Sequence, residues 1–180
     1  MVEYRTGRIY QSDIDMILNN VSYRGKFDGK LSAKLKRDFI NYHREYNKLC
    51  KERKFNDSLL GTVQIVEVQK HSGSHTGVAG AKWLVANLFT QYPINSDWDI
   101  ETDYLSLKQC FLYLRTVCNA TYFATKNDYW TLAVEYKIGC DDGRGNWKII
   151  KKMIDDIFGK EEHIKVLIMT GGNTPCAIEN

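Results

Sequence analysis

The sequence has few of the features that mark secreted, membrane-bound or disulfide-stabilised proteins. Its five cysteines form no C-x-x-C pair and are odd in number, which favours free thiols in a reducing compartment. No apolar run reaches transmembrane length, and no charged segment followed by an apolar one stands at the N-terminus. We therefore expect a cytoplasmic protein that neither enters a membrane nor is secreted.

An excess of charge of one sign is also missing. The formal net charge is +3, although charged residues make up 26% of the 180 residues. The one basic concentration, from Lys34 to Lys54, is typical of a solvated helix face, so we expect no nucleic-acid partner. No repeat, linker or low-complexity segment divides the chain. We expect a single domain over residues 1–180, with an irregular tail over residues 170–180.

The apolar pattern predicts strands alternating with helices. Short buried or alternating runs predict strands at Tyr4–Ile9, Met16–Leu18, Thr62–Val68, Lys82–Gln91, Trp130–Tyr136 and Ile164–Met169. Apolar residues at three- and four-residue steps predict helices at Leu31–Leu49, Glu101–Ala124 and Lys148–Phe158. Ser32 is a candidate cap for the first helix and Gly159 for the last. This alternation predicts an α/β fold with helices on both faces of a largely parallel sheet.

Two glycine-containing loops each follow a strand and precede a helix. The first runs from Tyr23 to Lys30, and the second, Ile138 to Trp147, has three glycines in eight residues. Such loops are either ordinary turns or cradles for a phosphate, because glycine lets the backbone approach an anion and a helix N-terminus attracts it. If the two preceding strands are neighbours, the loops would hold one pyrophosphate from opposite sides.

Three other polar features have a structural explanation that we prefer. Asn87, inside an apolar strand, is better explained as a hydrogen-bonded core amide than as a catalytic group. His71 and His75 lie in a glycine-containing turn, which argues against a helical metal site. Cys140 has no histidine placed beside it by the sequence, so we expect a packed thiol rather than a nucleophile.

Four motifs, in this order, resemble the macro domain over essentially the whole chain. They are Gly7-Arg8-Ile9, then Ile17-Leu18-Asn19-Asn20-Val21 followed by Gly25 and Gly29, then the strand W-L-V-A-N-L-F-T-Q, and finally I-G-C with a glycine-rich turn and Trp147. The similarity is greatest to the ADP-ribose-1''-phosphate phosphatase-like branch. It implies a three-layer α/β/α sandwich with a central mixed, largely parallel sheet, and an ADP-ribose cleft formed by the strand-end loops, with no cofactor or metal.

The resemblance also implies the activity. It implies binding of ADP-ribose or a related nucleotide, with hydrolysis of a distal phosphate or an ADP-ribosyl linkage as a further activity. The alternative is a non-catalytic module that reads or sequesters such a nucleotide. A third possibility is a degenerate domain that binds a protein partner and no nucleotide.

Site residues follow from the same resemblance. The candidate catalytic residues are Asn19, Asp28 and Asp142. The candidate ligand-binding residues are Arg8, Ile9, Asn20, Ser22, Gly25, Lys26, Phe27, Gly29, Lys30, Gly139, Cys140, Gly143, Arg144, Gly145 and Asn146. Backbone N–H groups of residues 25–29 and 143–146 would hold the diphosphate, and Asn19 and Asp28 would position the distal ribose under Phe27.

The chain departs from the family pattern at several of these positions. Arg8 replaces the aspartate that contacts adenine, and Ser22 replaces the second asparagine of the strand-end motif. Asp28 and Lys30 replace glycines of the first loop. Asp141 and Asp142 replace a glycine and an apolar residue of the second loop. Facing the ribose, Asp28 or Asp142 could orient a water molecule, whereas Asp141 and Asp142 facing solvent would be only turn residues.

Overall fold

The computed structural model describes most of the chain. The described residues are 1–10, 13–25, 29–39, 41–69, 82–93, 100–125, 129–140 and 143–171, with only the backbone described at residues 93, 100 and 123–125. The elements are β1 (Val2–Thr6), β2 (Met16–Ser22), α1 (Lys30–Asp38), α2 (Tyr42–Glu52), a 3-10 turn (Asp57–Leu59), β3 (Val63–Gln69), β4 (Lys82–Pro93), β5 (Ile100–Thr102), α3 (Tyr104–Thr125), β6 (Trp130–Glu135), α4 (Trp147–Phe158) and β7 (Ile164–Thr170).

The strands form one mixed, largely parallel sheet. Their order is β1-β7-β6-β2-β4-β3, and β5 pairs with β4 outside this path. Neighbouring strands from β1 to β4 are parallel, whereas β3 and β5 are antiparallel to β4. The predicted sheet is therefore confirmed. That residues 1–180 form a single domain stays a prediction.

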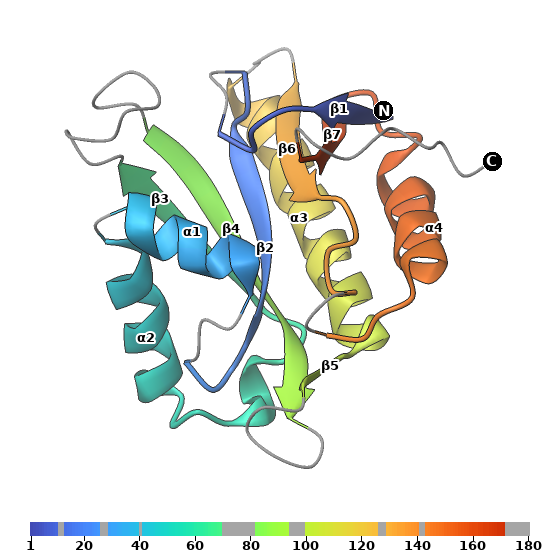
Figure 1. Ribbon diagram of the computed structural model, residues 1–180. Helices are drawn as coiled ribbons and strands as arrows, with labels where there is room; N and C mark the ends of the chain where they lie inside the picture. The colour runs from blue at the N-terminus through green and yellow to red at the C-terminus, as the bar shows by residue number, and fades with distance from the viewer. Residues whose placement is uncertain are drawn as a thin grey trace.

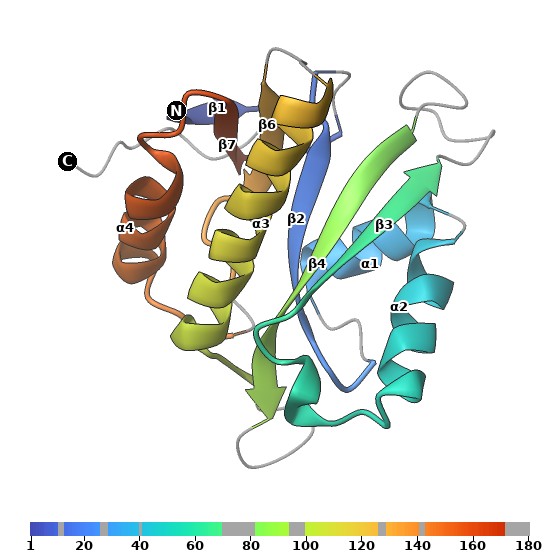
Figure 2. The ribbon, with the colours of Figure 1, turned by 180° about the vertical axis from the view of Figure 1, so that it is seen from behind.

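Helices cover both faces of the sheet, so the molecule has three layers (Figures 1 and 2). On one face, α3 and α4 pack with Leu18 and Leu88 of the sheet in the largest apolar cluster. On the other face, Leu35 of α1 packs with Ile17 and Val85. Successive residues of β2 thus serve opposite faces, as the two-residue period of a strand requires. The predicted α/β/α sandwich is confirmed.

The predicted helix from Leu31 to Leu49 is wrong, because two helices occupy this segment. Phe39 has extended backbone angles (φ −126°, ψ 124°), which end α1. Its ring is buried against Tyr10 and Trp83. Ser32 is not the cap either: Gly29 precedes α1, and the Ser32 hydroxyl is buried against Asn19.

Smaller corrections concern strand and helix ends. The first strand ends at Thr6, and Ile9 instead lies in the apolar core. Glu101 belongs to β5, a three-residue strand that the sequence did not predict. Asp103 caps α3, since its carboxylate accepts from the backbone N–H groups of Leu105 and Ser106. Gly159 follows α4 as predicted.

Four cysteines are free thiols among the described residues: Cys50, Cys110, Cys118 and Cys140. Burial raises the pKa of Cys50 to about 11 and those of Cys110 and Cys118 to about 12, so these three stay protonated at neutral pH. Within the described residues, no helix has the length and apolar character needed to cross a membrane. A cytoplasmic location stays a prediction.

Candidate functional site

The site lies where β2 and β6 separate. These neighbouring strands pair from Met16 and Leu132 to Leu18 and Val134, and β6 then ends at Glu135. On its other side β2 stays paired with β4 as far as Ser22. The chain leaves β2 toward α1 on one face and leaves β6 toward α4 on the other (Figures 1 and 2). Such a topological switch point is where open α/β sheets hold their ligands.

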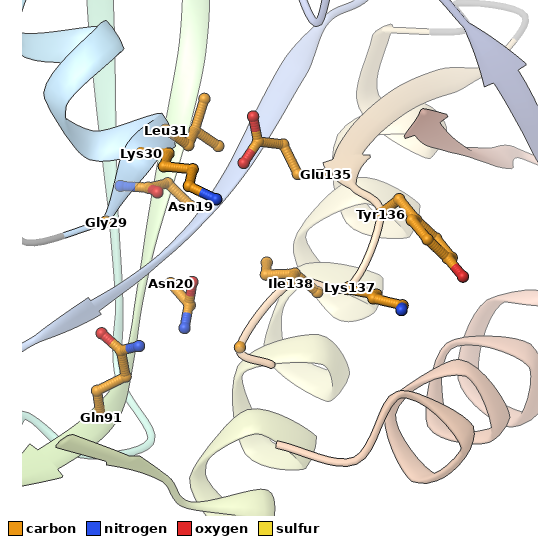
Figure 3. Close-up of a pocket in the computed structure, with 11 residues that line it drawn as sticks. Asn19, Asn20, Gly29, Lys30, Leu31, Gln91, Glu135, Tyr136, Lys137 and Ile138 are labelled. Atoms are coloured by element: carbon orange, nitrogen blue, oxygen red, sulfur yellow. The ribbon is translucent and has the colours of Figure 1, made fainter. Parts of the chain in front are cut away.

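A cavity of about 510 Å³, including the part open to solvent, occupies this position. The described residues that line it come from β2, β4 and β6, from the turn after β6 and from the start of α1 (Figure 3). They are Asn19, Asn20, Gly29, Lys30, Leu31, Gln91, Glu135, Tyr136, Lys137, Ile138 and Gly139.

Asn19 is held rigidly in the wall of the cavity. Its side chain is buried, and Nδ2 donates to the Ser32 hydroxyl at 3.0 Å and to the Tyr42 hydroxyl at 2.7 Å. Tyr42 donates in turn to Oδ1 of Asn87, and Asn87 donates to Oε1 of Gln64. Burial raises the pKa of Tyr42, so its hydroxyl keeps the proton that it donates. The expected core amide at Asn87 is confirmed.

Charged side chains stand beside the N-terminus of α1. Lys30 is the first residue of this helix, and the first turn contains no acidic residue. In Figure 3 the side chains of Lys30 and Glu135 extend into the same part of the cavity, beside Asn19. A helix N-terminus with a lysine attracts an anion, whereas the Glu135 carboxylate opposes one.

The second glycine loop forms the far wall through Gly139. The Gly139 carbonyl accepts from the Thr102 hydroxyl and from the Gly145 N–H, both at 2.8 Å. A Cβ atom at Gly143 would lie 2.1 Å from Thr102 Oγ1 and 3.1 Å from Gln91 Nε2. Glycine is needed at position 143 because β4, β5 and this loop meet there without room for a side chain.

Several solved structures with the same architecture are macrodomains. The macrodomain of Mycobacterium tuberculosis DarG is 18% identical over 94% of this chain and 97% of that one, with a TM-score of 0.68. Thermosipho africanus DarTG in complex with ADP-ribose is 15% identical over 88% of this chain and 39% of that one (TM-score 0.62). The Oceanobacillus iheyensis macrodomain with ADP is 13% identical over 93% and 82% (TM-score 0.57). The chain has the macrodomain fold.

The likeness extends to the fold alone. No protein-family model matches this macrodomain-like chain, and no curated protein matches it. Membership of the ADP-ribose-1''-phosphate phosphatase-like branch therefore stays a prediction.

The cavity brings together five of the residues expected from the sequence: Asn19, Asn20, Gly29, Lys30 and Gly139. Their roles in binding stay predictions. The strands that precede the two glycine loops, β2 and β6, are neighbours in the sheet, as the interpretation of the two loops as one site requires.

Four expected residues of the first half of the chain do not line the cavity. Arg8 is exposed, and Ile9 is part of the core. Ser22 is buried and its carbonyl accepts from the Tyr46 hydroxyl. Gly25 has a positive φ of 73° and lies against Phe55 and Asn47, where a Cβ would come within 2.9 Å of the Phe55 ring.

Five expected residues of the second loop also lie outside the described lining: Cys140, Gly143, Arg144, Gly145 and Asn146. Cys140 Sγ donates to the Ile138 carbonyl, and the residue packs on the core, as expected of a packed thiol. The Asn146 side chain caps α4, and its backbone N–H donates to the Tyr104 hydroxyl. The amides of Gly145 and Asn146 thus have protein acceptors instead of a diphosphate.

Several expected residues lie outside the described part of the chain: Lys26, Phe27, Asp28, Asp141 and Asp142, and the His71 and His75 pair. Within the described part, no group of three or more histidine, cysteine, aspartate or glutamate side chains could hold a metal ion.

Sequence reasoning missed Gln91 and Glu135, which line the cavity. Glu135 is the last residue of β6, and Gln91 follows the apolar part of β4, as Asn19 and Asn20 follow that of β2. The same strand-end signal could have found them. Leu31, Tyr136, Lys137 and Ile138 carried no comparable signal, because they come from a helix start and from a turn.

Proposed function

We propose that this chain binds ADP-ribose or a closely related nucleotide in the cavity between the ends of β2, β4 and β6. The observation that carries the proposal is the N-terminus of α1 opening into a cavity at the sheet's switch point. In the proposed complex the diphosphate lies at Gly29 and Lys30, where the first backbone N–H groups of a helix have no acceptor within the helix.

A further observation supports a nucleotide rather than a small anion. Solved structures with this fold include DarTG in complex with ADP-ribose and a macrodomain with ADP.

Calorimetric titration with ADP-ribose tests the proposal, with two lysines of α1 compared. Lys30 borders the cavity, whereas Lys34 is exposed one turn further along the helix. Lys30→Met removes the charge next to the proposed diphosphate and is expected to weaken binding about ten-fold, the effect of one charge-assisted hydrogen bond. Lys34→Met is the matched control and should change the affinity by less than about two-fold. Equal effects, or no binding to the wild-type chain, would refute the proposal.

Hydrolysis of a distal phosphate or of an ADP-ribosyl linkage is the second candidate function. It is favoured by Glu135, the carboxylate found among the described lining residues of the cavity. A carboxylate in such a cavity can accept a proton from an attacking water. Asn19, by contrast, uses both amide hydrogens on Ser32 and Tyr42, which suits a positioning residue. Asp28 and Asp142 remain candidate bases.

Phosphate release from ADP-ribose-1''-phosphate and release of ADP-ribose from a modified acceptor test this activity. An enzyme would lose turnover at least about 100-fold in Glu135→Gln, Asp28→Asn or Asp142→Asn, the usual contribution of a general base. Binding of ADP-ribose without turnover of either substrate would instead identify a non-catalytic module.

A further inference from the structure

A basic surface covers the layer of the molecule that α1 and α2 form (Figure 1). Eight of the 25 lysines and arginines, but only three of the 22 acidic residues, lie between Lys34 and Lys54. This segment therefore carries a charge of +5, whereas the rest of the chain carries −2. All eight cations are exposed, and none is among the described residues that line the cavity. They form the α1/α2 basic surface: Lys34, Lys36, Arg37, Arg44, Lys48, Lys51, Arg53 and Lys54.

Most of these cations are not neutralised by the protein. On α4, in the opposite layer, two lysines each pair with an aspartate one helical turn away. On the basic surface, Arg37 pairs with Asp38 and Arg44 with Glu45, and the other six cations form no ion pair among the described residues. The sequence alone favoured a solvated helix face without a nucleic-acid partner. The lack of internal partners instead favours an external anion.

Like charges also follow one another along α2. Arg44, Lys48 and Lys51 occupy positions i, i+4 and i+7, so they lie in one row on the helix. Such neighbours repel one another and lower the stability of the helix, a cost that a bound polyanion would offset. With a rise of about 1.5 Å per residue, the row is about 10 Å long, which corresponds to about three nucleotides of a stacked strand.

An exposed aromatic ring follows this row in the chain. Phe55 is 37% exposed, and its ring lies against Gly25. Lys54 and Phe55 have left-handed backbone angles (φ 54° and 52°), a conformation that is unfavourable for residues other than glycine. Arg24, next to Gly25 in the chain, is also exposed. The ring therefore has cations next to it, as in surfaces that stack a nucleobase and hold its phosphates.

We propose that the α1/α2 basic surface binds a single-stranded nucleic acid. The phosphates lie along Arg44, Lys48 and Lys51, and a base stacks on Phe55. A chain of acidic residues would neutralise the same cations, but it has no planar base for the exposed ring. A single strand fits better than a duplex, because its bases are free to stack on a side chain. This inference is independent of the proposed function, since none of these four residues belongs to the described lining of the cavity.

The test is fluorescence anisotropy of the whole chain with a labelled 20-nucleotide oligothymidylate. The wild type should bind with a Kd of about 1 μM at 50 mM salt and about 100-fold more weakly at 200 mM, as expected for about five phosphate contacts. The variant Arg44→Gln/Lys48→Gln/Lys51→Gln should bind at least about ten-fold more weakly at 50 mM salt. Its plot of log affinity against log salt should be shallower by about 2.

The matched control removes three exposed lysines outside the basic surface, in the variant Lys108→Gln/Lys148→Gln/Lys160→Gln. This variant has the same net charge as the α2 variant and should bind the oligonucleotide within about three-fold of the wild type. A thermal melt should show no loss of Tm in the α2 variant, because it removes repelling neighbours. Saturating ADP-ribose should leave oligonucleotide binding within about two-fold, because the surface lies outside the described cavity lining.

An abasic oligonucleotide of the same length tests the stacked base. The wild type should bind it about ten-fold more weakly than oligothymidylate, and Phe55→Leu should abolish this difference. Because the two probes are compared on the same variant, a change in folding alone would not remove the difference.

Equal losses in the two triple variants, displacement of the oligonucleotide by ADP-ribose, or no binding by the wild type would each overturn the proposal. Binding of polyglutamate as tightly as oligothymidylate would overturn it too and would assign the surface to an acidic protein.

Discussion

Glu135 and Lys30 set the charge at one end of the cavity. Both border it, and a carboxylate next to a diphosphate raises the free energy of the complex by repulsion. Under the proposed hydrolysis, the same carboxylate would accept a proton from the attacking water.

Glu135→Gln is therefore expected to strengthen ADP-ribose binding. Removing one partly exposed negative charge should raise the affinity about two- to five-fold, with a larger gain at low ionic strength. The measurement is calorimetry at two salt concentrations. Glu162→Gln, at an exposed position outside the cavity lining, is the control and should have no effect. Weaker binding in Glu135→Gln would contradict this placement of the diphosphate.

Tyr42 holds together the polar network behind Asn19. Its buried hydroxyl accepts from Asn19 and donates to Asn87, so that each partner depends on it. The apolar body of the ring packs with the α1 face of the core. A single hydroxyl thus satisfies two buried amides.

Tyr42→Phe should destabilise the fold by about 1–3 kcal/mol, since it leaves a buried donor on Asn19 and a buried acceptor on Asn87 without this partner. Urea unfolding measures the effect. Tyr113→Phe, at an α3 position that is 49% exposed, is the control and should change the free energy of unfolding by less than about 0.5 kcal/mol. Similar stabilities of the two variants would show that the network does not hold the fold.

The glycine-rich sequence of the loop between β6 and α4 suggested a site for an anion, but in the structure the backbone of this loop packs closely against the protein. Gly139 and Gly143 meet Thr102 of β5, and Asn146 starts α4. Glycines that looked like an anion cradle are required first of all by close packing between the loop and β5. A large side chain at position 143, as in Gly143→Glu, would therefore disturb the loop itself and would not test binding alone.

Gly143→Ala should lower stability by about 1–3 kcal/mol, the usual cost of inserting a methyl group into a packed region. Thermal or urea unfolding measures it. Gly171→Ala provides the matched control, because a Cβ there meets nothing within 4 Å. A Gly143→Ala variant as stable as Gly171→Ala would show that the loop adjusts freely and is not fixed against β5.

The longer elements were predictable because their apolar patterns are long. β4 and α3 are examples, whereas β5 has three residues and too little pattern to detect. The division between α1 and α2 was missed for a different reason. Leu35, Phe39 and Tyr42 all face the same cluster, so their spacing continues that of a helix across the break. Phe39 is extended because its ring packs with Trp83, a contact distant in sequence.

Some of the residues that line the cavity can be predicted from local sequence, whereas others can be placed there only when the order of the strands is known. Asn19, Asn20 and Gly139 were expected from the resemblance, and each of them also follows an apolar run. Gln91 and Glu135 show the same local signal, but their meeting at one cavity depends on β4, β2 and β6 being neighbours. Local sequence patterns do not encode this order, since parallel neighbours are joined by long crossovers.

The order and connections of the strands determine where the cavity lies in the molecule. Chain connections leave the adjacent strands β2 and β6 toward opposite faces, and the separation opens a cavity that receives the start of α1 (Figures 1 and 3). The start of α1, which attracts anions, then lies in one cavity with polar side chains from β2, β4 and β6. This arrangement is the basis for proposing a nucleotide that is held by its diphosphate.

A crystal structure with ADP-ribose tests that claim most directly. We predict that the diphosphate lies at Gly29 and Lys30, between the ends of β2 and β6. The same structure would show where Asp28 and Asp142 lie relative to the sugar. Density for ADP-ribose at another surface, or an empty cavity at saturating ligand, would contradict the account.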